Sequence, residues 1–272
     1  MEKYHRNERI GAIVKILTEN PNKIFTLNYF AEMFNAAKST VSEDIVIAKK
    51  MMDKFSFGII ETLSGAAGGV KYIPIFSEDK SKELVHDLCT RLSSTDRIIP
   101  GGFLYMTDII YSPDIVSVIG RILATHFMDA GADYVLTIET KGIPIALMTA
   151  KYLNIPLVIV RSGSKVTEGS TVSINYVSGS TKRIQTMSLS RRAVKRGTKS
   201  IFIDDFMKAG GTATGIMELM KEFENEVLGI GVLMESKEPE IKMVDNYISL
   251  LTLDGVDEEN NIVKIEPSST FL

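Results

Sequence analysis

Apolar residues recur at helical spacing through the first 54 residues of the chain. The first two stretches place them at positions i, i+3, i+4 and i+7, and the third at i, i+4, i+7 and i+11, which predicts amphipathic helices. Asn20-Pro21 ends the first stretch, since a helix stops at or before the residue that precedes a proline. A short break at 35–38 separates the second stretch from the third. The three apolar stripes are Ile10, Ile13, Val14 and Leu17; Leu27, Phe30, Ala31 and Phe34; and Val41, Ile45, Ala48 and Met52.

The third helix is expected to begin at Thr40, because Thr40 and Glu43 have the spacing of a capping box. Two short β-prone runs follow, at 58–63 and 70–74, and a glycine-rich turn separates them. Three helices followed by a glycine-tipped hairpin predict a winged helix-turn-helix, which we assign to residues 1–74.

The pattern changes after residue 75. Polar and charged residues at 77–83 mark either a linker or the start of a second domain, which we assign to residues 75–272. Beyond them, buried strands alternate with helices, which predicts a parallel α/β sheet with ligands at the carboxyl ends of its strands. A stretch rich in Ser, Gly and Thr at 165–185 indicates a long, mobile hairpin. The expected helices are 115–122, 143–153 and 212–223, and the expected strands are 134–139, 157–160, 200–203 and 227–233.

Residues 200–215, SIFIDDFMKAGGTATG, carry the most informative motif. An apolar strand leads into Asp204 and Asp205, a small-residue turn follows, and Thr212 opens a helix. Free N–H groups at a helix N-terminus favour a phosphate, whereas two carboxylates suit ribose hydroxyls or Mg²⁺. An isolated Asp-Asp pair would indicate an ordinary strand-to-helix turn. The complete order of strand, acids, glycines and threonine favours a ligand that combines phosphate, ribose and a metal-bound anion.

This order resembles the 5-phosphoribosyl-1-pyrophosphate (PRPP) signature of type I phosphoribosyltransferases, and it matches neither a Walker A nor a dinucleotide loop. A second turn, Thr140-Lys141-Gly142, also lies between a strand and a helix. It resembles the pyrophosphate loop of the adenine and xanthine branch of these enzymes. Lys141 supplies positive charge, and Gly142 lets backbone N–H groups approach an anion. We expect both loops at one edge of the sheet.

Charge is distributed unevenly along the chain, although its net value is only −3. Residues 161–199 contain nine Lys or Arg against one Glu, a net of +8. In the phosphoribosyltransferases this position holds a flexible loop, so the resemblance implies that Arg161 and Lys165 face the pyrophosphate. Tyr176, Lys182 and Arg183 are expected to close over it or to stay exposed. A solvated hairpin remains the plain alternative, and a positive rim also attracts nucleic-acid phosphates.

Two aromatic residues are candidates to cover a purine ring, although aromatic residues more often belong to a core. Phe206 follows the acidic pair directly, and Tyr105 follows the Gly101-Gly102 turn. The step from Phe206 to Lys208 departs from the aliphatic step of the enzymes. It adds bulk and charge beside the phosphate, which argues against turnover.

The N-terminal module carries polar and basic residues where a recognition helix would meet DNA. Such residues contact base edges and phosphates. Helix-turn-helix folds also serve as dimerisation or docking modules, and the net charge of residues 1–54 is only +2. A DNA-binding module of this charge needs a dimer. The candidate DNA contacts are Lys38, Ser39, Thr40, Ser42 and Lys49 on the third helix, Lys71 on the hairpin, and Arg6 and Arg9 before them.

Over its whole length the chain is similar to the purine operon repressors of Gram-positive bacteria, with further matching stretches at 66–74, 100–109 and 165–180. The resemblance implies a homodimeric DNA-binding protein that represses purine synthesis and salvage genes. It also implies release by PRPP, with Mg²⁺ as its companion, competition by guanine nucleotides such as ppGpp, and no catalysis. The implied effector site is Asp204, Asp205, Phe206, Lys208, Ala209, Gly210, Gly211 and Thr212, with Thr140, Lys141, Gly142, Arg161 and Tyr105.

Two other functions remain open from the residues alone. One is an active purine phosphoribosyltransferase with an added N-terminal domain, and the other is an RNA-binding attenuator that uses the basic hairpin. One cysteine, Cys89, and no apolar run near 20 residues indicate a soluble cytoplasmic protein that does not engage a membrane. The three histidines have no metal-ligand spacing, so no resident metal site is expected.

Overall fold

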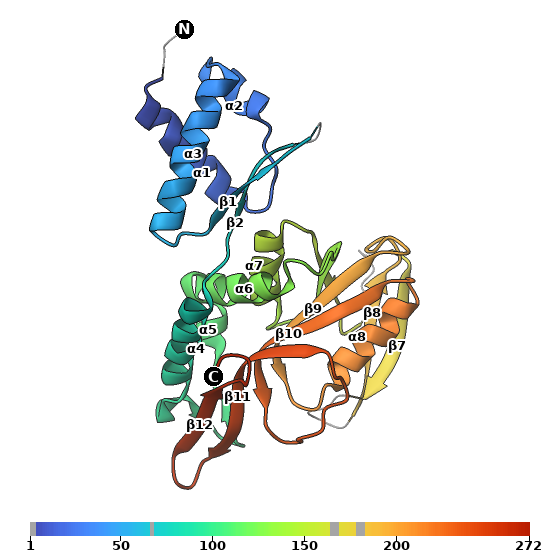
Figure 1. Ribbon diagram of the computed structural model, residues 1–272. Helices are drawn as coiled ribbons and strands as arrows, with labels where there is room; N and C mark the ends of the chain where they lie inside the picture. Colours follow the sequence, from blue (N-terminus) through green and yellow to red (C-terminus); the bar gives the residue numbers. More distant parts are fainter. Residues whose placement is uncertain (1–3, 66–67, 164–168, 178–182) are drawn as a thin grey trace. The chain divides into compact units, whose positions relative to one another are not determined.

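The computed structural model describes residues 4–65, 68–163, 169–177 and 183–272. The chain divides into two compact units (Figure 1). The first comprises Met1–Ser77 with Lys151–Asn154, and the second comprises Glu78–Ala150 with Ile155–Leu272.

The first unit contains the predicted winged helix-turn-helix. Three helices and an antiparallel hairpin enclose one core, in which Ile13, Phe30 and Val41 are fully buried. These side chains belong to the three stripes that the sequence presents at helical spacing. The elements are α1 (Arg6–Glu19), α2 (Leu27–Phe34), α3 (Lys38–Lys54), β1 (Ile59–Leu63) and β2 (Gly69–Ile73).

The turn between α2 and α3 differs from the sequence prediction in its register. Asn35 ends α2 in the left-handed conformation, with φ of 47°, which asparagine tolerates better than most residues. Helix α3 then begins at Lys38, with Ala37 at its N-cap and no side-chain cap. The expected capping box at Thr40 is therefore wrong, because Thr40 already lies inside the helix.

The second unit is built on a six-stranded sheet in the order β12-β11-β10-β9-β5-β6. All neighbours run parallel except the edge strand β12, which confirms the predicted parallel α/β sheet. Its strands are β5 (Tyr134–Ile138), β6 (Leu157–Val160), β9 (Lys199–Met207), β10 (Glu226–Ser236), β11 (Tyr247–Asp257) and β12 (Ile262–Pro267).

Helices and two small hairpins complete this unit. Helix α4 begins at Glu78, so the polar stretch at 77–83 opens the second unit and is not a linker. The basic hairpin pairs β7 with β8, and its far strand extends beyond the expected end at residue 185. The remaining elements are α4 (Glu78–Leu92), η1 (Thr95–Arg97), β3 (Ile98–Ile99), β4 (Phe103–Leu104), α5 (Thr107–Ile110), α6 (Pro113–Phe127), α7 (Ile143–Leu153), β7 (Thr171–Val177), β8 (Ile184–Ser190) and α8 (Gly211–Lys221).

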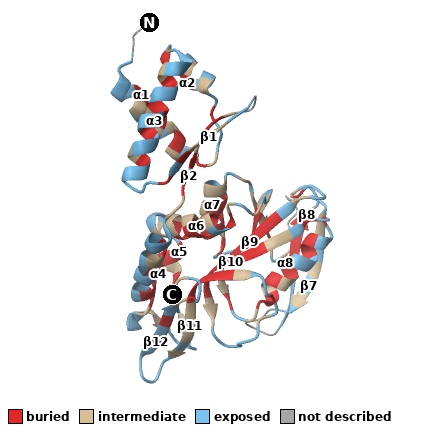
Figure 2. Ribbon diagram, in the orientation of Figure 1, coloured by how far each residue is buried: buried red, intermediate tan, exposed pale blue. Residues whose placement is uncertain are grey.

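The two faces of the sheet are covered by different helices. On one face α8 packs against the central strands and lies beside the β7–β8 hairpin. Figure 2 colours the buried residues of the sheet red. On the other face α6 approaches β10, where a Cβ at Gly231 would lie 2.9 Å from a ring carbon of Phe127. Glycine therefore permits close contact between helix and sheet at this point.

The order of the strands reverses between β5 and β9. From β5 the chain passes through α7 to β6, whereas from β9 it passes through α8 to β10 on the opposite side. The two strands pair only as far as Leu136 and Phe202, and no later pair joins them. Such a switch point forms a crevice at the carboxyl ends of parallel strands, which is where ligands bind in α/β sheets.

Candidate functional site

Strand β9 carries the acidic pair to the switch point. The strand extends to Met207, so Asp204 and Asp205 belong to the strand itself and do not follow it as expected. A short turn leads to Gly210, the N-cap of α8, whose φ of +87° favours glycine. No described side chain caps this helix, which begins at Gly211 and not at Thr212. The first N–H groups of α8 have no intrahelical acceptor and suit an anion.

A pocket with about 440 Å³ of space, including its open mouth, lies between this turn and the sheet. Its size is within the range of small-molecule sites. Nearly all of the residues predicted on the acidic motif border it, whereas Asp205 lies beside it and is half-buried. The pocket is lined by Phe202, Asp204, Phe206, Met207, Lys208, Ala209, Gly210, Gly211, Thr212, Ala213, Ile230 and Val232.

Asp204 has an unusual electrostatic environment for a carboxyl group. It is only 8% exposed, and burial raises its pKa well above the ordinary value, with a further increase from the adjacent Asp205. The backbone N–H of Asp205 donates to Asp204 Oδ1 at 2.9 Å. Among the described residues, no Lys or Arg forms an ion pair with Asp204. This carboxyl is therefore poised to gain a hydroxyl donor or a cation from a ligand.

The second predicted loop meets Asp204 directly. Gly142 is buried, and a Cβ atom added there would lie 2.6 Å from Asp204 Oδ1 and 2.7 Å from Thr137 Oγ1. Only glycine lets the loop approach the carboxyl so closely. Thr140 and Lys141 are exposed beside it, and the Glu139–Thr140 peptide is cis. The two loops therefore meet at one edge of the sheet, as their positions after strands predict.

Arg161 lies beside the Thr140 loop and is held there by an ion pair. Its Nη1 lies 3.1 Å from Glu139 Oε2, so the guanidinium pairs with the residue just before the Thr140 loop. Ser162 also holds this carboxylate, because its N–H and hydroxyl both donate to Glu139 Oε1 at 2.8 Å. In this arrangement Arg161 braces the loop, and its contact with a pyrophosphate stays a prediction. Sequence spacing gave no sign of the Glu139 pairing.

The basic hairpin places one predicted residue against the pocket. Tyr176 on β7 is half-buried; burial raises the pKa of its phenol, a hydrogen bond with Thr212 lowers it, and the charge of Asp204 raises it. Arg183 is exposed. Lys165 and Lys182, expected near the pyrophosphate, lie outside the described residues.

Tyr105 lies apart from the pocket lining. It follows β4, its backbone N–H donates to the carbonyl of Arg97 at 2.8 Å, and its ring is exposed. Phe206, by contrast, lines the pocket. Phe206 is therefore the better placed of the two candidates to contact a purine.

The N-terminal unit presents most of the predicted DNA contacts at its surface. Lys38, Ser39, Ser42 and Lys49 are exposed on α3, and Thr40 is half-exposed. Lys71 on β2 is half-buried and pairs with Glu61 at 3.0 Å. Exposure of this kind on a recognition helix suits contact with a nucleic-acid groove.

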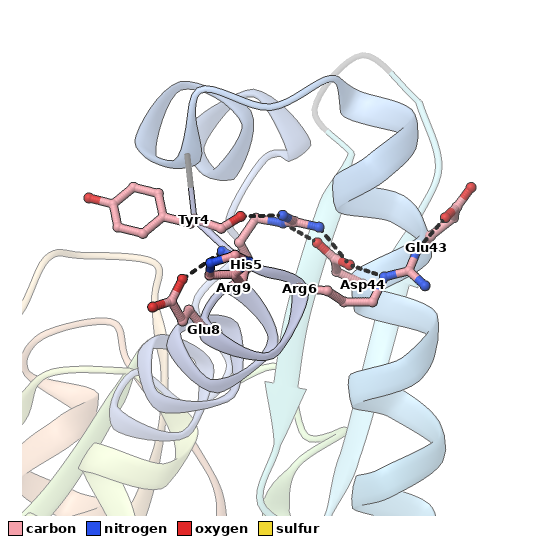
Figure 3. A network of polar contacts seen from close by, with 7 residues as sticks. All are labelled: Tyr4, His5, Arg6, Glu8, Arg9, Glu43 and Asp44. Carbon is pink, nitrogen blue, oxygen red and sulfur yellow. Dashed lines mark hydrogen bonds and ion pairs between the residues drawn. The ribbon is translucent and has the colours of Figure 1, made fainter. Parts of the chain in front are cut away.

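The prediction that Arg9 contacts DNA is wrong. Its Nε donates to Asp44 Oδ2 at 2.6 Å and its Nη1 donates to the carbonyl of Tyr4 at 2.7 Å (Figure 3). Hydrogen bonding to Asp44 raises the pKa of the guanidinium. Arg9 is only 8% exposed, so it joins α1 to α3 and is not available to a DNA phosphate. Arg6 stays exposed; it pairs with Glu43 at 2.9 Å and with the buried Asp44 at 3.5 Å.

The described residues contain neither a metal-binding cluster nor a membrane-spanning helix. No group of three or more His, Cys, Asp or Glu side chains there could hold a metal ion. None of the helices described is long and apolar enough to cross a membrane.

Comparison with known proteins decides the family. Residues 5–74 match the model of the N-terminal domain of bacterial purine repressors, and residues 106–268 match the phosphoribosyl transferase domain. The purine biosynthesis transcriptional repressor PurR of Bacillus subtilis is 46% identical over 97% of this chain and 93% of its own length. The chain belongs to the PurR family.

Members of the PurR family do not all carry the same description. The PurR of Lactococcus lactis subsp. lactis, 37% identical over 98% of both chains, is named a transcriptional activator. Among solved structures, adenine phosphoribosyltransferase from Rhodothermus marinus aligns with a TM-score of 0.53 at 21% identity, covering 64% of this chain and 99% of the enzyme. This last likeness shows that the second unit has the phosphoribosyltransferase fold.

Proposed function

We propose that this chain represses transcription of purine biosynthesis and salvage genes by binding operator DNA, and that PRPP bound to the second unit releases it. The observation that carries the proposal is the meeting at Asp204 of the two loops predicted to bind anions, in a chain that also contains a winged helix-turn-helix. A metabolite pocket fused to a DNA-binding module supports a regulator whose operator affinity depends on the metabolite.

The pocket offers separate groups for each part of PRPP. The N–H groups at the start of α8 would hold the 5′-phosphate, and Asp204 and Asp205 would accept hydrogen bonds from the ribose hydroxyls. Lys141 and the backbone of its loop would hold the pyrophosphate. The carboxyl of Asp204, buried without a cationic partner among the described residues, suits a hydroxyl or a cation of the ligand. Mg²⁺, bound through the pyrophosphate oxygens and Asp205, would offset the negative charge of the ligand.

We further propose that the second unit binds PRPP without transferring its phosphoribosyl group. Its full-length relatives are named as regulators, and Lys208 places a charge in the step beside the phosphate turn. An active purine phosphoribosyltransferase is the alternative. Incubation with PRPP, Mg²⁺ and a panel of purine bases distinguishes them, because release of pyrophosphate would overturn the non-catalytic assignment.

The chain could repress or activate its target genes, and we propose that it represses them. Repression is favoured because the relative at 46% identity is a repressor, whereas the activator is 37% identical. A reporter gene under a purine promoter tests it: deletion of the chain's gene should raise expression if the chain represses, and lower it if the chain activates.

Three further features belong to this proposal. The chain would act as a cytoplasmic homodimer, because one winged helix of modest charge gives limited affinity for DNA. Guanine nucleotides such as ppGpp would compete with PRPP for the pocket. Sedimentation of the full chain and displacement of bound PRPP by ppGpp test these two features.

The deciding experiment is a titration of the complex between the full chain and duplex operator DNA, followed by fluorescence anisotropy. PRPP with Mg²⁺ should weaken DNA binding at least tenfold, about 1.4 kcal/mol of coupling. Binding should also weaken steeply with salt, because phosphate contacts release counterions. Lys38→Ala should weaken DNA binding without changing PRPP affinity. DNA affinity that ignores PRPP would refute the proposal, and stronger binding to RNA than to duplex DNA would favour an attenuator.

A further inference from the structure

Thr137 is the exception among the buried polar side chains that the structure describes. Its Oγ1 is buried and has no hydrogen-bond partner, and among the described residues it is the only buried side-chain polar atom in this state. Other buried polar side chains are satisfied; for example, Ser200 donates to Asn225 at 2.5 Å and Thr149 donates to Ile145 at 2.9 Å. A buried hydroxyl without a partner costs stability, so its presence requires an explanation.

The position of Thr137 suggests that explanation. It lies on β5 opposite Ile159 of β6, one residue beyond the last pair that joins β5 to β9. It therefore stands where the two central strands diverge, at the switch point of the sheet. The hydroxyl is buried and does not reach the surface of the molecule.

Thr137 and Asp204 both lie close to Gly142. A Cβ atom at Gly142 would lie 2.7 Å from Thr137 Oγ1 and 2.6 Å from Asp204 Oδ1. The hydroxyl of Thr137 can donate a hydrogen bond but has no acceptor. The carboxyl of Asp204 accepts a hydrogen bond from the N–H of Asp205 and can accept more. The two groups are chemically complementary and close together, but they are not bonded in this structure.

We propose that Thr137 is a positioning residue of the effector site, whose hydroxyl donates to the Asp204 carboxylate when PRPP fills the pocket. The inference rests on the proposed function, because it assigns Asp204 to the ligand. When the ligand binds, one oxygen of the Asp204 carboxylate contacts the ribose or its cation. The hydroxyl of Thr137 donates to the other oxygen and holds the carboxylate in that orientation. The hydrogen bond exists only in the bound state, so its free energy contributes to ligand affinity and not to the stability of the free protein.

The test compares Thr137→Val with Thr137→Ser in the full chain. Valine keeps the shape of the side chain and removes the hydroxyl, whereas serine keeps the hydroxyl. Calorimetric titration with PRPP and Mg²⁺ should show about tenfold weaker binding for Thr137→Val and an affinity near wild type for Thr137→Ser. The thermal midpoint of the free protein should stay level or rise in Thr137→Val, since an unsatisfied hydroxyl is removed.

Thr149→Val is the matched control. Thr149 is equally buried, but its hydroxyl is already bonded within α7. This variant should lower the thermal midpoint of the free protein and leave PRPP affinity unchanged. If Thr137→Val destabilises the free protein as Thr149→Val does, the Thr137 hydroxyl is already bonded without ligand and the inference is wrong.

The remaining outcomes separate this inference from the function on which it rests. Wild-type affinity for PRPP in Thr137→Val overturns the role of Thr137 and leaves the effector site standing. Absence of PRPP binding in the wild-type chain overturns the proposed function, and the role of Thr137 falls with it. If Thr137→Val does not fold, Thr137→Ala replaces it against the same serine variant, with the same expected loss of affinity.

Discussion

The two units each bury an aspartate, and they treat it in opposite ways. In the N-terminal unit Asp44 is completely buried, and the guanidinium of Arg9 contacts it at 2.6 Å. In the second unit Asp204 is nearly as buried, but its charged neighbour is another carboxyl, Asp205. A buried charge is costly unless it is paired. The first aspartate therefore completes a fold, whereas the second stands ready for a ligand.

The sharpest test of this comparison is Asp44→Ala. The change leaves Arg9 buried without its counter-charge, so we expect the unfolding free energy of the N-terminal unit to fall by about 3–5 kcal/mol. DNA binding should be lost, because Asp44 lies on α3 between the exposed residues of the recognition helix. Chemical denaturation and PRPP titration of the full chain measure the two effects. Loss of PRPP affinity would contradict the assignment of Asp44 to structure alone.

The role of Arg9 shows how far the sequence alone reaches. Arg9 stands four residues before Ile13, and Asp44 stands three residues after Val41, so both occupy the apolar stripes of their helices. Two oppositely charged residues on the apolar stripes of two helices that pack together indicate a buried ion pair. The position of Arg9 near the N-terminus predicts a DNA contact, whereas its place on the stripe predicts burial, and the structure shows burial.

Asp204→Ala is the matching change in the second unit. It removes a group assigned to the ligand, so PRPP affinity should fall at least 100-fold, about 2.7 kcal/mol. The stability of the free protein should be unchanged or higher, since the lost carboxyl has no described cationic partner. Operator binding without PRPP should stay at the wild-type level. A clear drop in thermal midpoint, comparable with that of Asp44→Ala, would show that both aspartates serve the fold.

Gly142→Ala alters the space around Asp204 without changing its chemistry. The added methyl would lie 2.6 Å from Asp204 Oδ1 and 3.1 Å from its Cα, so either the loop or the carboxyl must shift. We expect PRPP affinity to fall about tenfold or more, measured by calorimetry. Gly255→Ala is the control, because no described atom lies within 4 Å of a Cβ there and PRPP affinity should not change. Equal affinity in both variants would separate the Thr140 loop from the effector site.

The elements around this site were more predictable than its internal geometry. The alternation of strands and helices predicts the parallel sheet, and the order of acids and glycines predicts the loop. Sequence spacing does not reveal that β9 continues through Met207 or that Thr137 and Gly142 meet Asp204, because these are contacts between segments far apart in the chain. The pairing of Arg161 with Glu139 was missed for the same reason.

The stability of the folded chain should depend on pH through Asp204, with a smaller effect than the substitutions above and a sign that can be predicted. The pKa of Asp204 is raised in the folded state, so the folded chain binds more protons than the unfolded chain between about pH 4 and that raised pKa. The contribution of Asp204 to stability therefore decreases as pH rises through this window. Asp204→Asn should show a flatter decline than wild type in thermal midpoints measured across the window. A steeper decline in the variant would mean that Asp204 is stabilised as an anion.

The smallest expected effect concerns Glu43, which lies on α3 beside the buried pair. Its side chain is 67% exposed and pairs with Arg6, itself 56% exposed, at 2.9 Å. Exposed pairs of this kind contribute about 0–1 kcal/mol to stability. Glu43→Gln should therefore leave the fold intact. It should strengthen operator binding two- to fivefold, because it removes a negative charge from the recognition helix and takes from Arg6 its exposed partner. Arg6 keeps its contact with the buried Asp44 at 3.5 Å, and its guanidinium can still meet a DNA phosphate.

Salt dependence makes this last test specific. If Arg6 gains a phosphate contact, the slope of log affinity against log salt should steepen by about one unit in Glu43→Gln. Glu19→Gln is the matched control: Glu19 is 57% exposed and pairs with Lys15 at 2.6 Å, at the other end of α1. It should change neither the affinity nor the slope. Weaker operator binding in Glu43→Gln would mean that the Arg6–Glu43 pair itself orients α3. The exposed pair would then have a structural role, as the buried Arg9–Asp44 pair does.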